Sequence, residues 1–244
     1  MSESKVSIII PCYNAEKWIK QTVESALNQT YDNIEVIVVD NESTDKSCDI
    51  INELLNESSK LSLNTAENIY PHCWDEARSK GFSLAQGKYF FTLASDDLLH
   101  RDYVKNCLRY FNNGKIKVQM LQSAIRSIDS DGNFLRDINH NYRSLQDLKE
   151  TLLMKCPINS PTVIYDRELY DNGLLETSPE TFSGAADYDL YCSLVDKNYF
   201  IFSVGSWLGY YYRWHEEQAT WQMHKKEINY DLLIQNKWRK KWSV

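Results

Sequence analysis

Two adjacent acidic residues at the end of an apolar run are the side chains in this chain best suited to chemistry. The run begins at Phe90, and Ser95, Asp96 and Asp97 follow it directly. Carboxylate oxygens at the end of a buried strand are the ligands that Mg²⁺ and Mn²⁺ prefer, and they can share the metal with a phosphorylated ligand. Taken alone, the pair is better explained as the cap of a following helix. The interpretation therefore depends on the residues that precede it.

The elements before this pair predict a parallel sheet. Residues 6–10 and 34–39 are short apolar runs rich in β-branched residues, which is typical of strands buried on both faces. Asn14 is expected to cap the helix that follows the first run, and residues 75–86 and 88–93 predict a later helix and strand. Strand–helix alternation predicts right-handed crossovers. Open α/β sheets bind ligands at the carboxyl edge, which would bring together residues 11–14, 40–45 and 95–97.

The second half of the chain has a less regular pattern. Residues 117–128 and 134–138 flank a turn and predict a hairpin. Residues 145–154 and 187–195 predict helices, and residues 199–212 are rich in strand-forming and aromatic residues. We therefore expect one domain over residues 1–222, in two halves at 1–100 and 101–222, and a C-terminal helical tail at 223–244.

Composition limits the class of protein. The net charge of −7 over 244 residues argues against nucleic acid as the main partner. Six scattered cysteines without a Cys-x-x-Cys pair are typical of reduced thiols in the cytosol. No signal-peptide pattern is evident at Met1, and no apolar run approaches the roughly 20 residues that span a bilayer. We expect a cytoplasmic protein.

Four segments in order resemble family 2 glycosyltransferases with the GT-A fold. They are Ser7-Ile8-Ile9-Ile10-Pro11-Cys12-Tyr13-Asn14, Val38-Val39-Asp40-Asn41-Glu42-Ser43-Thr44-Asp45, Ala77-Arg78-Ser79-Lys80-Gly81 with Ala85-Gln86-Gly87-Lys88-Tyr89, and Ser95-Asp96-Asp97. The resemblance implies an α/β fold with a mostly parallel, Rossmann-like central sheet flanked by helices and a smaller acceptor-side subsheet. It is dense over residues 5–100 and looser to about 215. It implies a GT-A glycosyltransferase domain over residues 1–222, with a nucleotide-sugar-binding half at 1–100 and an acceptor-side half at 101–222.

The resemblance also implies a metal-dependent, inverting transfer from a nucleotide diphosphate sugar, with a UDP-sugar as the first expectation. The acceptor would be a saccharide or a lipid-linked saccharide of a cell-surface polysaccharide. A Mn²⁺ or Mg²⁺ ion would neutralise the departing diphosphate. The donor would be bound by Pro11, Tyr13 and Asn14 on the nucleotide side, by Asp40 and Asn41 at the base or ribose, and by Arg78, Ser95 and Asp96 near the sugar diphosphate. Arg78 is equally consistent with a solvated helix residue.

Three acidic or basic positions complete the expected site. Asp187 resembles the general base of the family, in Gly184-Ala185-Ala186-Asp187-Tyr188-Asp189-Leu190; the alternative is an acid favourable to the dipole of the helix that it begins. The segment Tyr212-Arg213-Trp214-His215 resembles a late element that returns to the diphosphate or metal. The metal ligands are then expected to be Asp96, Asp97 and His215.

Three departures from the family pattern keep a second hypothesis open. Asn41, Ala94 and Ala186 stand where relatives carry acids. An amide offers a donor as well as an acceptor, which weakens the expectation of uracil recognition. A non-catalytic nucleotide-sugar-binding protein of the same fold is the alternative. A nucleotidyltransferase is less favoured, because residues 11–16 lack a glycine-rich phosphate loop.

The tail is basic and aromatic at Trp238-Arg239-Lys240-Lys241-Trp242. Such a segment can lie on an anionic membrane surface, where a lipid-linked acceptor would reside. The alternative is an exposed, charged helix end.

Overall fold

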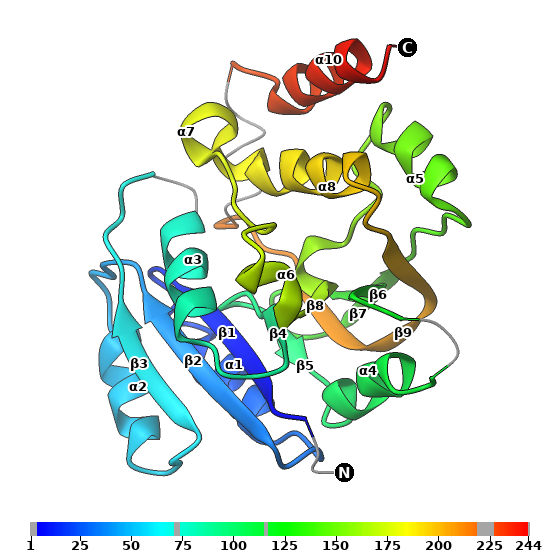
Figure 1. The fold of residues 1–244 in the computed structure, drawn as a ribbon. Coiled ribbons are helices and arrows are strands. Elements are labelled where there is room, and N and C mark those ends of the chain that lie inside the picture. Colours follow the sequence, from blue (N-terminus) through cyan, green and yellow to red (C-terminus); the bar gives the residue numbers. More distant parts are fainter. Residues whose placement is uncertain (1–3, 71–73, 115–116, 219–226, 244) are drawn as a thin grey trace.

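Four parallel strands form the N-terminal half of one mixed sheet (Figure 1). The computed structural model describes residues 4–70, 74–114, 117–218 and 227–243. The four strands are β1 (Val6–Cys12), β2 (Ile34–Asp40), β3 (Leu61–Thr65) and β4 (Tyr89–Thr92), in the order β3-β2-β1-β4. Asp40 pairs with both Cys12 and Thr65, so β1, β2 and β3 end together at one edge. Thr92 pairs with Ile9, and the chain after β4 therefore continues along that edge.

Helices cover both faces of this half. They are α1 (Ile19–Leu27), α2 (Ser47–Leu55) and α3 (Asp75–Leu84). Side chains alternate along a strand, and accordingly Ile8 and Ile10 pack in the core with α1 and α2, whereas Ile9 packs in the core with α3. A Cβ at Gly81 would overlap Ile9, so the glycine lets α3 lie close against β1. The predicted alternation of strands and helices is confirmed.

The strands of the second half extend the same sheet. They are β5 (Leu98–Leu99), β6 (Met120–Ile128), β7 (Phe134–Ile138), β8 (Ile164–Asp166) and β9 (Ile201–Arg213). β8 lies antiparallel between β4 and β6, β9 runs parallel to β6, and β5 pairs antiparallel with β9. β6 and β7 form the predicted hairpin. The α/β fold is confirmed, with the expected subsheet joined to the parallel half through β8.

The sheet has a hydrophobic core on each face, and the second core, which includes residues of α3, α5, α8 and α10, lies between the sheet and the C-terminal helices. The other helices in the described ranges are α4 (Tyr103–Phe111), α5 (Leu145–Leu152), α6 (Arg167–Asp171), α7 (Pro179–Phe182), α8 (Ala186–Asp196) and α10 (Tyr230–Trp242), with short 3₁₀ turns η1 (Ser160–Thr162) and η2 (Ser183–Ala185). In Figure 1, α8 lies between α10 and the sheet. None of the helices in the described ranges is long and apolar enough to cross a bilayer.

The C-terminal helix packs against α8. Ile234 and Trp238 are buried, the Lys237 ammonium lies 2.7 Å from an Asp189 carboxylate oxygen, and Trp238 Nε1 donates to the same carboxylate at 2.7 Å. The expected tail is therefore helical but belongs to the second core, and the expected boundary at residue 222 lies outside the described residues.

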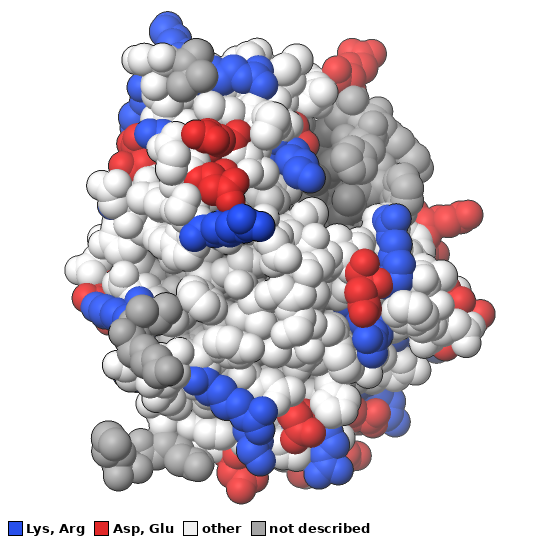
Figure 2. Space-filling model, turned by 90° about the vertical axis from the view of Figure 1, so that its right-hand side faces the viewer, with Lys and Arg blue, Asp and Glu red and all other residues white. Residues whose placement is uncertain are grey.

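One face of the molecule shows how charge is distributed. Figure 2 shows Lys and Arg mixed with Asp and Glu in small groups around a central area of uncharged residues. The described part of this face therefore offers no broad basic surface of the kind that binds nucleic acid.

Candidate active site at the carboxyl edge of the sheet

Two loops at the sheet edge are tied together by side chains from distant parts of the sequence. The backbone N–H of Asn14 donates to Ser43 Oγ at 2.9 Å, and Asn14 Oδ1 accepts from the N–H of Thr44 at 2.7 Å. Asn14 has a φ of 47° and helix α1 begins only at Ile19. The expectation that Asn14 caps this helix is therefore wrong. Its side chain instead fixes the β1–α1 loop to the β2–α2 loop.

The residues expected on the nucleotide side include two buried oxygens without a partner among the described residues. Asp40 Oδ2 accepts from the N–H of Ser43 at 3.0 Å, whereas Asp40 Oδ1 and Asn41 Oδ1 have no hydrogen-bond partner among the described residues. Both side chains are 3% exposed. A buried acceptor without a donor is unfavourable by about 1–3 kcal/mol. The two oxygens are therefore suited to accept from N–H or O–H groups of a ligand.

Pro11 and Tyr13 flank Cys12, which pairs with Asp40 across β1 and β2, but the two residues differ in exposure. Pro11 is buried within β1, whereas Tyr13 is 51% exposed. Pro11 therefore shapes the strand end, and the Tyr13 ring is free to lie against a planar ligand.

Asp96 and His215 form the pair of groups best placed to hold a cation. His215 Nε2 lies 2.8 Å from Asp96 Oδ2, and the His215 ring packs on Trp18 with centroids 4.0 Å apart. His215 Nδ1 is buried without a described partner. The preceding residue, Ser95, is half-buried, and its carbonyl accepts from Thr22 Oγ1 at 2.9 Å, which holds this loop against α1.

Asp97 faces the interior. One of its carboxylate oxygens accepts from the backbone N–H of Arg213 at 2.7 Å, and the other accepts from the Tyr210 hydroxyl at 2.8 Å. The residue is 0% exposed, and burial raises the pKa of its carboxyl group. This position does not match the metal-ligand role expected for Asp97. The carboxyl group instead joins the loop after β4 to strand β9.

The donor set at Asp96 fits a hard divalent cation when a diphosphate completes it. In the described ranges no group of three or more His, Cys, Asp or Glu side chains is arranged to hold a metal. Mg²⁺ in nucleotide sites is usually bound by one or two carboxylates together with substrate phosphates. Asp96, whose side chain is 21% exposed, and His215 are the groups that could supply that protein share.

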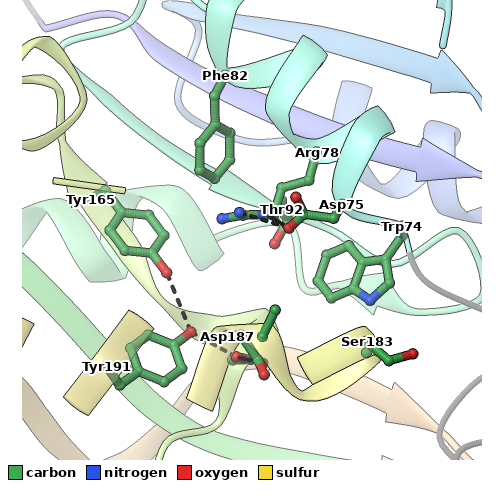
Figure 3. Close-up of a pocket in the computed structure, with 12 residues that line it drawn as sticks. Trp74, Asp75, Arg78, Phe82, Thr92, Tyr165, Ser183, Asp187 and Tyr191 are labelled. Carbon is green, nitrogen blue, oxygen red and sulfur yellow. Dashed lines mark hydrogen bonds and ion pairs between the residues drawn. The ribbon is translucent and has the colours of Figure 1, made fainter. Parts of the chain in front are cut away.

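A pocket lies between Thr92, at the end of β4, and the start of α8 (Figure 3). Its lining is Trp74, Asp75, Arg78, Phe82, Thr92, Ser160, Tyr165, Ser183, Gly184, Ala186, Asp187 and Tyr191. Asp187 accepts from the Ser160 hydroxyl and, at 2.7 Å, from the backbone N–H of Tyr188. Burial raises the pKa of Asp187, while these two hydrogen bonds and the charge of Arg78 oppose the rise. A carboxyl group with a raised pKa in a pocket is a candidate general base.

Arg78 lies in the same pocket rather than in solvent. It is 7% exposed, and one guanidinium nitrogen lies 2.9 Å from Asp75 Oδ1 and 2.8 Å from Thr177 Oγ1. Its guanidinium also packs over the Phe82 ring, 4.9 Å from the centroid. The alternative of a solvated helix residue is therefore wrong.

Sequence reasoning missed several pocket residues. Trp74, Ser160, Tyr165 and Tyr191 come from four separate segments, and none belongs to a motif. The one available sequence signal concerned Trp74, which directly precedes the helix predicted from residue 75.

The fold and these two groups of residues define a GT-A protein. The structure of TarS from S. aureus in complex with UDP-GlcNAc matches with a TM-score of 0.71 and 22% identity over 92% of this chain and 62% of that chain. The mannosyltransferase PcManGT from Pyrobaculum calidifontis, in complex with GDP-Man and Mn²⁺, matches with a TM-score of 0.62 and 13% identity over 100% of this chain and 76% of that chain. Residues 7–174 match the family described as Glycosyl transferase family 2. The chain belongs to this family.

Curated relatives agree with this family. A glycosyltransferase of Haemophilus influenzae is 34% identical over 169 residues, which is 69% of this chain and 64% of the relative. Chondroitin synthase of Escherichia coli is 32% identical over 189 residues, 78% of this chain. The chain spans 26% of the chondroitin synthase and 27% of a similar glycosyltransferase of Rickettsia bellii.

Proposed function

We propose that this protein transfers a sugar from a nucleotide diphosphate sugar, in the first instance a UDP-sugar, to a saccharide or lipid-linked acceptor of a cell-surface polysaccharide. One observation carries the proposal. A partly buried carboxylate, Asp187, lines a pocket at the same sheet edge as the Asp96–His215 pair. A base and a diphosphate-binding group at one edge are what a transfer from such a donor requires.

The nucleotide would lie over the ends of β1 and β2. The unpartnered oxygens of Asp40 and Asn41 would accept from donors on the base or ribose, and the Tyr13 ring would lie against the base. Asn14 supports this surface by fixing the loop. Ser95 and Asp96 would lie at the diphosphate, and Asp96 with His215 would hold Mn²⁺ or Mg²⁺. A divalent cation bound there would neutralise charge that develops on the departing diphosphate.

The pocket beside Asp187 would bind the reacting groups. Asp187 would accept the proton of the acceptor hydroxyl while that oxygen attacks the anomeric carbon from the face opposite the diphosphate. The bond between that carbon and the diphosphate oxygen breaks, and the configuration inverts. Arg78, held by Asp75 and Thr177, supplies a positive charge in the same pocket. A pKa raised by burial makes Asp187 a stronger base than an exposed aspartate.

A panel of donors tests this function. We expect the purified protein with Mn²⁺ or Mg²⁺ to release nucleoside diphosphate from a UDP-sugar in the presence of saccharide acceptors, and calorimetry to detect donor binding that weakens when EDTA removes the metal. GDP- and dTDP-sugars are the controls. Metal-dependent donor binding with neither transfer nor hydrolysis would instead support the non-catalytic alternative. Binding of no nucleotide sugar would contradict both.

We also propose that α10 contacts an anionic membrane on its cytoplasmic side, where a lipid-linked acceptor would be presented. The residues involved differ from those first expected, because Trp238 is buried against α8. Leu232 and Leu233 are 47% and 49% exposed at the start of α10, and the last turn carries Arg239, Lys240 and Lys241. Exposed apolar residues and cations on one helix are typical of an interfacial helix.

Vesicle flotation tests this contact. We expect the protein to float with phosphatidylglycerol-containing vesicles and the double variant Leu232→Glu/Leu233→Glu to lose at least half of the bound fraction. Leu135→Glu, at an equally exposed leucine on β7, is the matched control and should bind as the wild type does. Equal binding of the wild type and the α10 variant would remove the proposal.

A further inference from the structure

A line of three hydroxyl groups ends on the Asp187 carboxylate. Ser160 hydrogen-bonds to Asp187 Oδ2, Ser160 Oγ lies 2.6 Å from the Tyr191 hydroxyl, and the Tyr191 and Tyr165 hydroxyls are 3.3 Å apart. The four side chains come from η1, α8 and β8. Figure 3 shows the two tyrosine hydroxyls pointing at each other and toward Asp187.

The direction of these hydrogen bonds follows from the inventory of donors. An ionised carboxylate only accepts, so Ser160 must use its single hydrogen on Asp187. Ser160 therefore accepts from Tyr191, and Tyr191, having used its hydrogen, accepts from Tyr165. Each hydroxyl polarises the next in such a chain. All three O–H groups are thus aligned toward the charge on Asp187.

The hydroxyl of Tyr191 has no packing role that a phenylalanine ring would not fill. Tyr191 is 1% exposed within the second core. Burying a hydroxyl in a core is unfavourable unless it is hydrogen-bonded, and a phenylalanine ring occupies nearly the same space. The polar atoms in this core are therefore best explained by the carboxylate at the end of the line.

We propose that Ser160 and Tyr191 are positioning residues, which fix the orientation of the Asp187 carboxylate and stabilise its ionised form for proton abstraction. This inference rests on the proposed function of Asp187 as the base. Burial disfavours the ionised form, and the hydroxyl line opposes that effect. Removing hydroxyl groups from this line should therefore raise the pKa of Asp187, because the charged form loses its donors.

Other charged and titratable groups also act on Asp187. Arg78 on α3 favours the ionised form of Asp187, whereas Asp231 on α10 disfavours it. The other hydrogen bond that Asp187 accepts is from the backbone N–H of Tyr188. The titratable neighbours on the other packed elements are Asp75 on α3, Tyr165 on β8 and Cys156 before η1. None of these groups changes in the variants below.

Titration of Asp187 itself provides the test. Carboxyl ¹³C resonances of protein labelled at aspartate Cγ are followed against pH, and the Asp187 signal is assigned by its absence in Asp187→Asn. We expect the midpoint to rise by about 1–2 pH units in Ser160→Ala, which loses a hydrogen bond to a charged group. We expect a rise of about 0.5 pH unit in Tyr191→Phe, which loses only the polarisation of that bond.

Tyr188→Phe is the matched control. Tyr188 lies on the same helix, is 2% exposed and donates its hydroxyl to the Leu152 carbonyl, away from Asp187. The titration midpoint of Asp187 in Tyr188→Phe should equal that in the wild type. In the enzyme assay, the acidic limb of the kcat profile should move to higher pH in Tyr191→Phe, with the KM for the donor unchanged.

The two readouts separate this inference from the proposed function. An unchanged Asp187 midpoint in both Ser160→Ala and Tyr191→Phe, with an active wild type, would overturn the positioning role alone. An inactive wild type, or an active Asp187→Asn, would overturn the proposed base and with it the role of the hydroxyl line in catalysis. The isosteric Tyr191→Phe guards against the case in which Ser160→Ala does not fold.

Discussion

Replacing Asp187 with Asn should reduce the rate of sugar transfer about 10²–10⁴-fold, the range that general base catalysis contributes. Asparagine has nearly the same shape, and its single amide oxygen can keep one of the two hydrogen bonds, which the carboxylate accepts from Ser160 and from the N–H of Tyr188 on separate oxygens. It has no basic group, however, to take the proton of the acceptor hydroxyl. The affinity for the donor, measured by calorimetry with UDP-sugar and Mn²⁺, should change less than threefold, since the variant retains the Asp96 and Asp40 groups.

Asp189 supplies the control for this variant. It lies two residues further along α8 and forms an ion pair with Lys237 and a hydrogen bond with Trp238. Asp189→Asn should weaken the contact between α8 and α10 and lower the melting temperature, but it should leave the transfer rate within a few-fold of the wild type. Transfer by Asp187→Asn at the wild-type rate would remove Asp187 as the base.

The N-terminal half was predictable because its signals are local. β-Branched runs and helical spacing lie within ten residues of one another, and they predicted β1, β2, α3 and β4 with small differences at the ends. The prediction that Asn14 caps α1 was wrong because its side chain makes a tertiary contact. Its preferred hydrogen-bond partner is Thr44, thirty residues away, and no local pattern reports that contact.

The roles of Asp96 and Asp97 could not be separated by sequence. Both follow the same strand, and their order does not tell which carboxyl group faces the interior. The answer comes from β9, which brings the Tyr210 hydroxyl and the N–H of Arg213 to Asp97 and His215 to Asp96. Strand β9 lies more than one hundred residues later, so the distinction is a property of the fold.

The pocket was the least predictable part of the site. β8 and η1 are three residues each, too short for any periodicity, yet they carry Tyr165 and Ser160. Asp187 was found only because its segment resembles a family motif. The tail at 238–242 was expected to be helical and is, but the spacing alone did not reveal that Trp238 turns toward α8.

Replacing Asp97 with Ala should lower the free energy of unfolding by about 3–5 kcal/mol, because two buried donors lose their acceptor and a cavity remains. The donors are the Tyr210 hydroxyl and the N–H of Arg213, and Arg213 also donates to the carbonyls of Asp96 and Ser130. Loss of Asp97 would therefore loosen β9 from the loop that carries Asp96. Urea unfolding followed by circular dichroism measures the change, and Asp97→Asn, which keeps one acceptor, should lose less.

Asp96→Ala should have little effect on stability but a large effect on metal-dependent donor binding. The Asp96 side chain is partly exposed and its side-chain partner is His215, so we expect a loss of less than about 1 kcal/mol in unfolding free energy. The variant should nevertheless lose the part of the donor affinity that EDTA removes from the wild type, because the carboxylate expected to hold the metal is gone. If Asp97→Ala is as stable as the wild type, or Asp96→Ala retains metal-dependent donor binding, the division of roles between these neighbours is wrong. The Asp96 carboxylate is partly accessible from solvent, whereas the buried Asp97 carboxylate holds the loop that presents it.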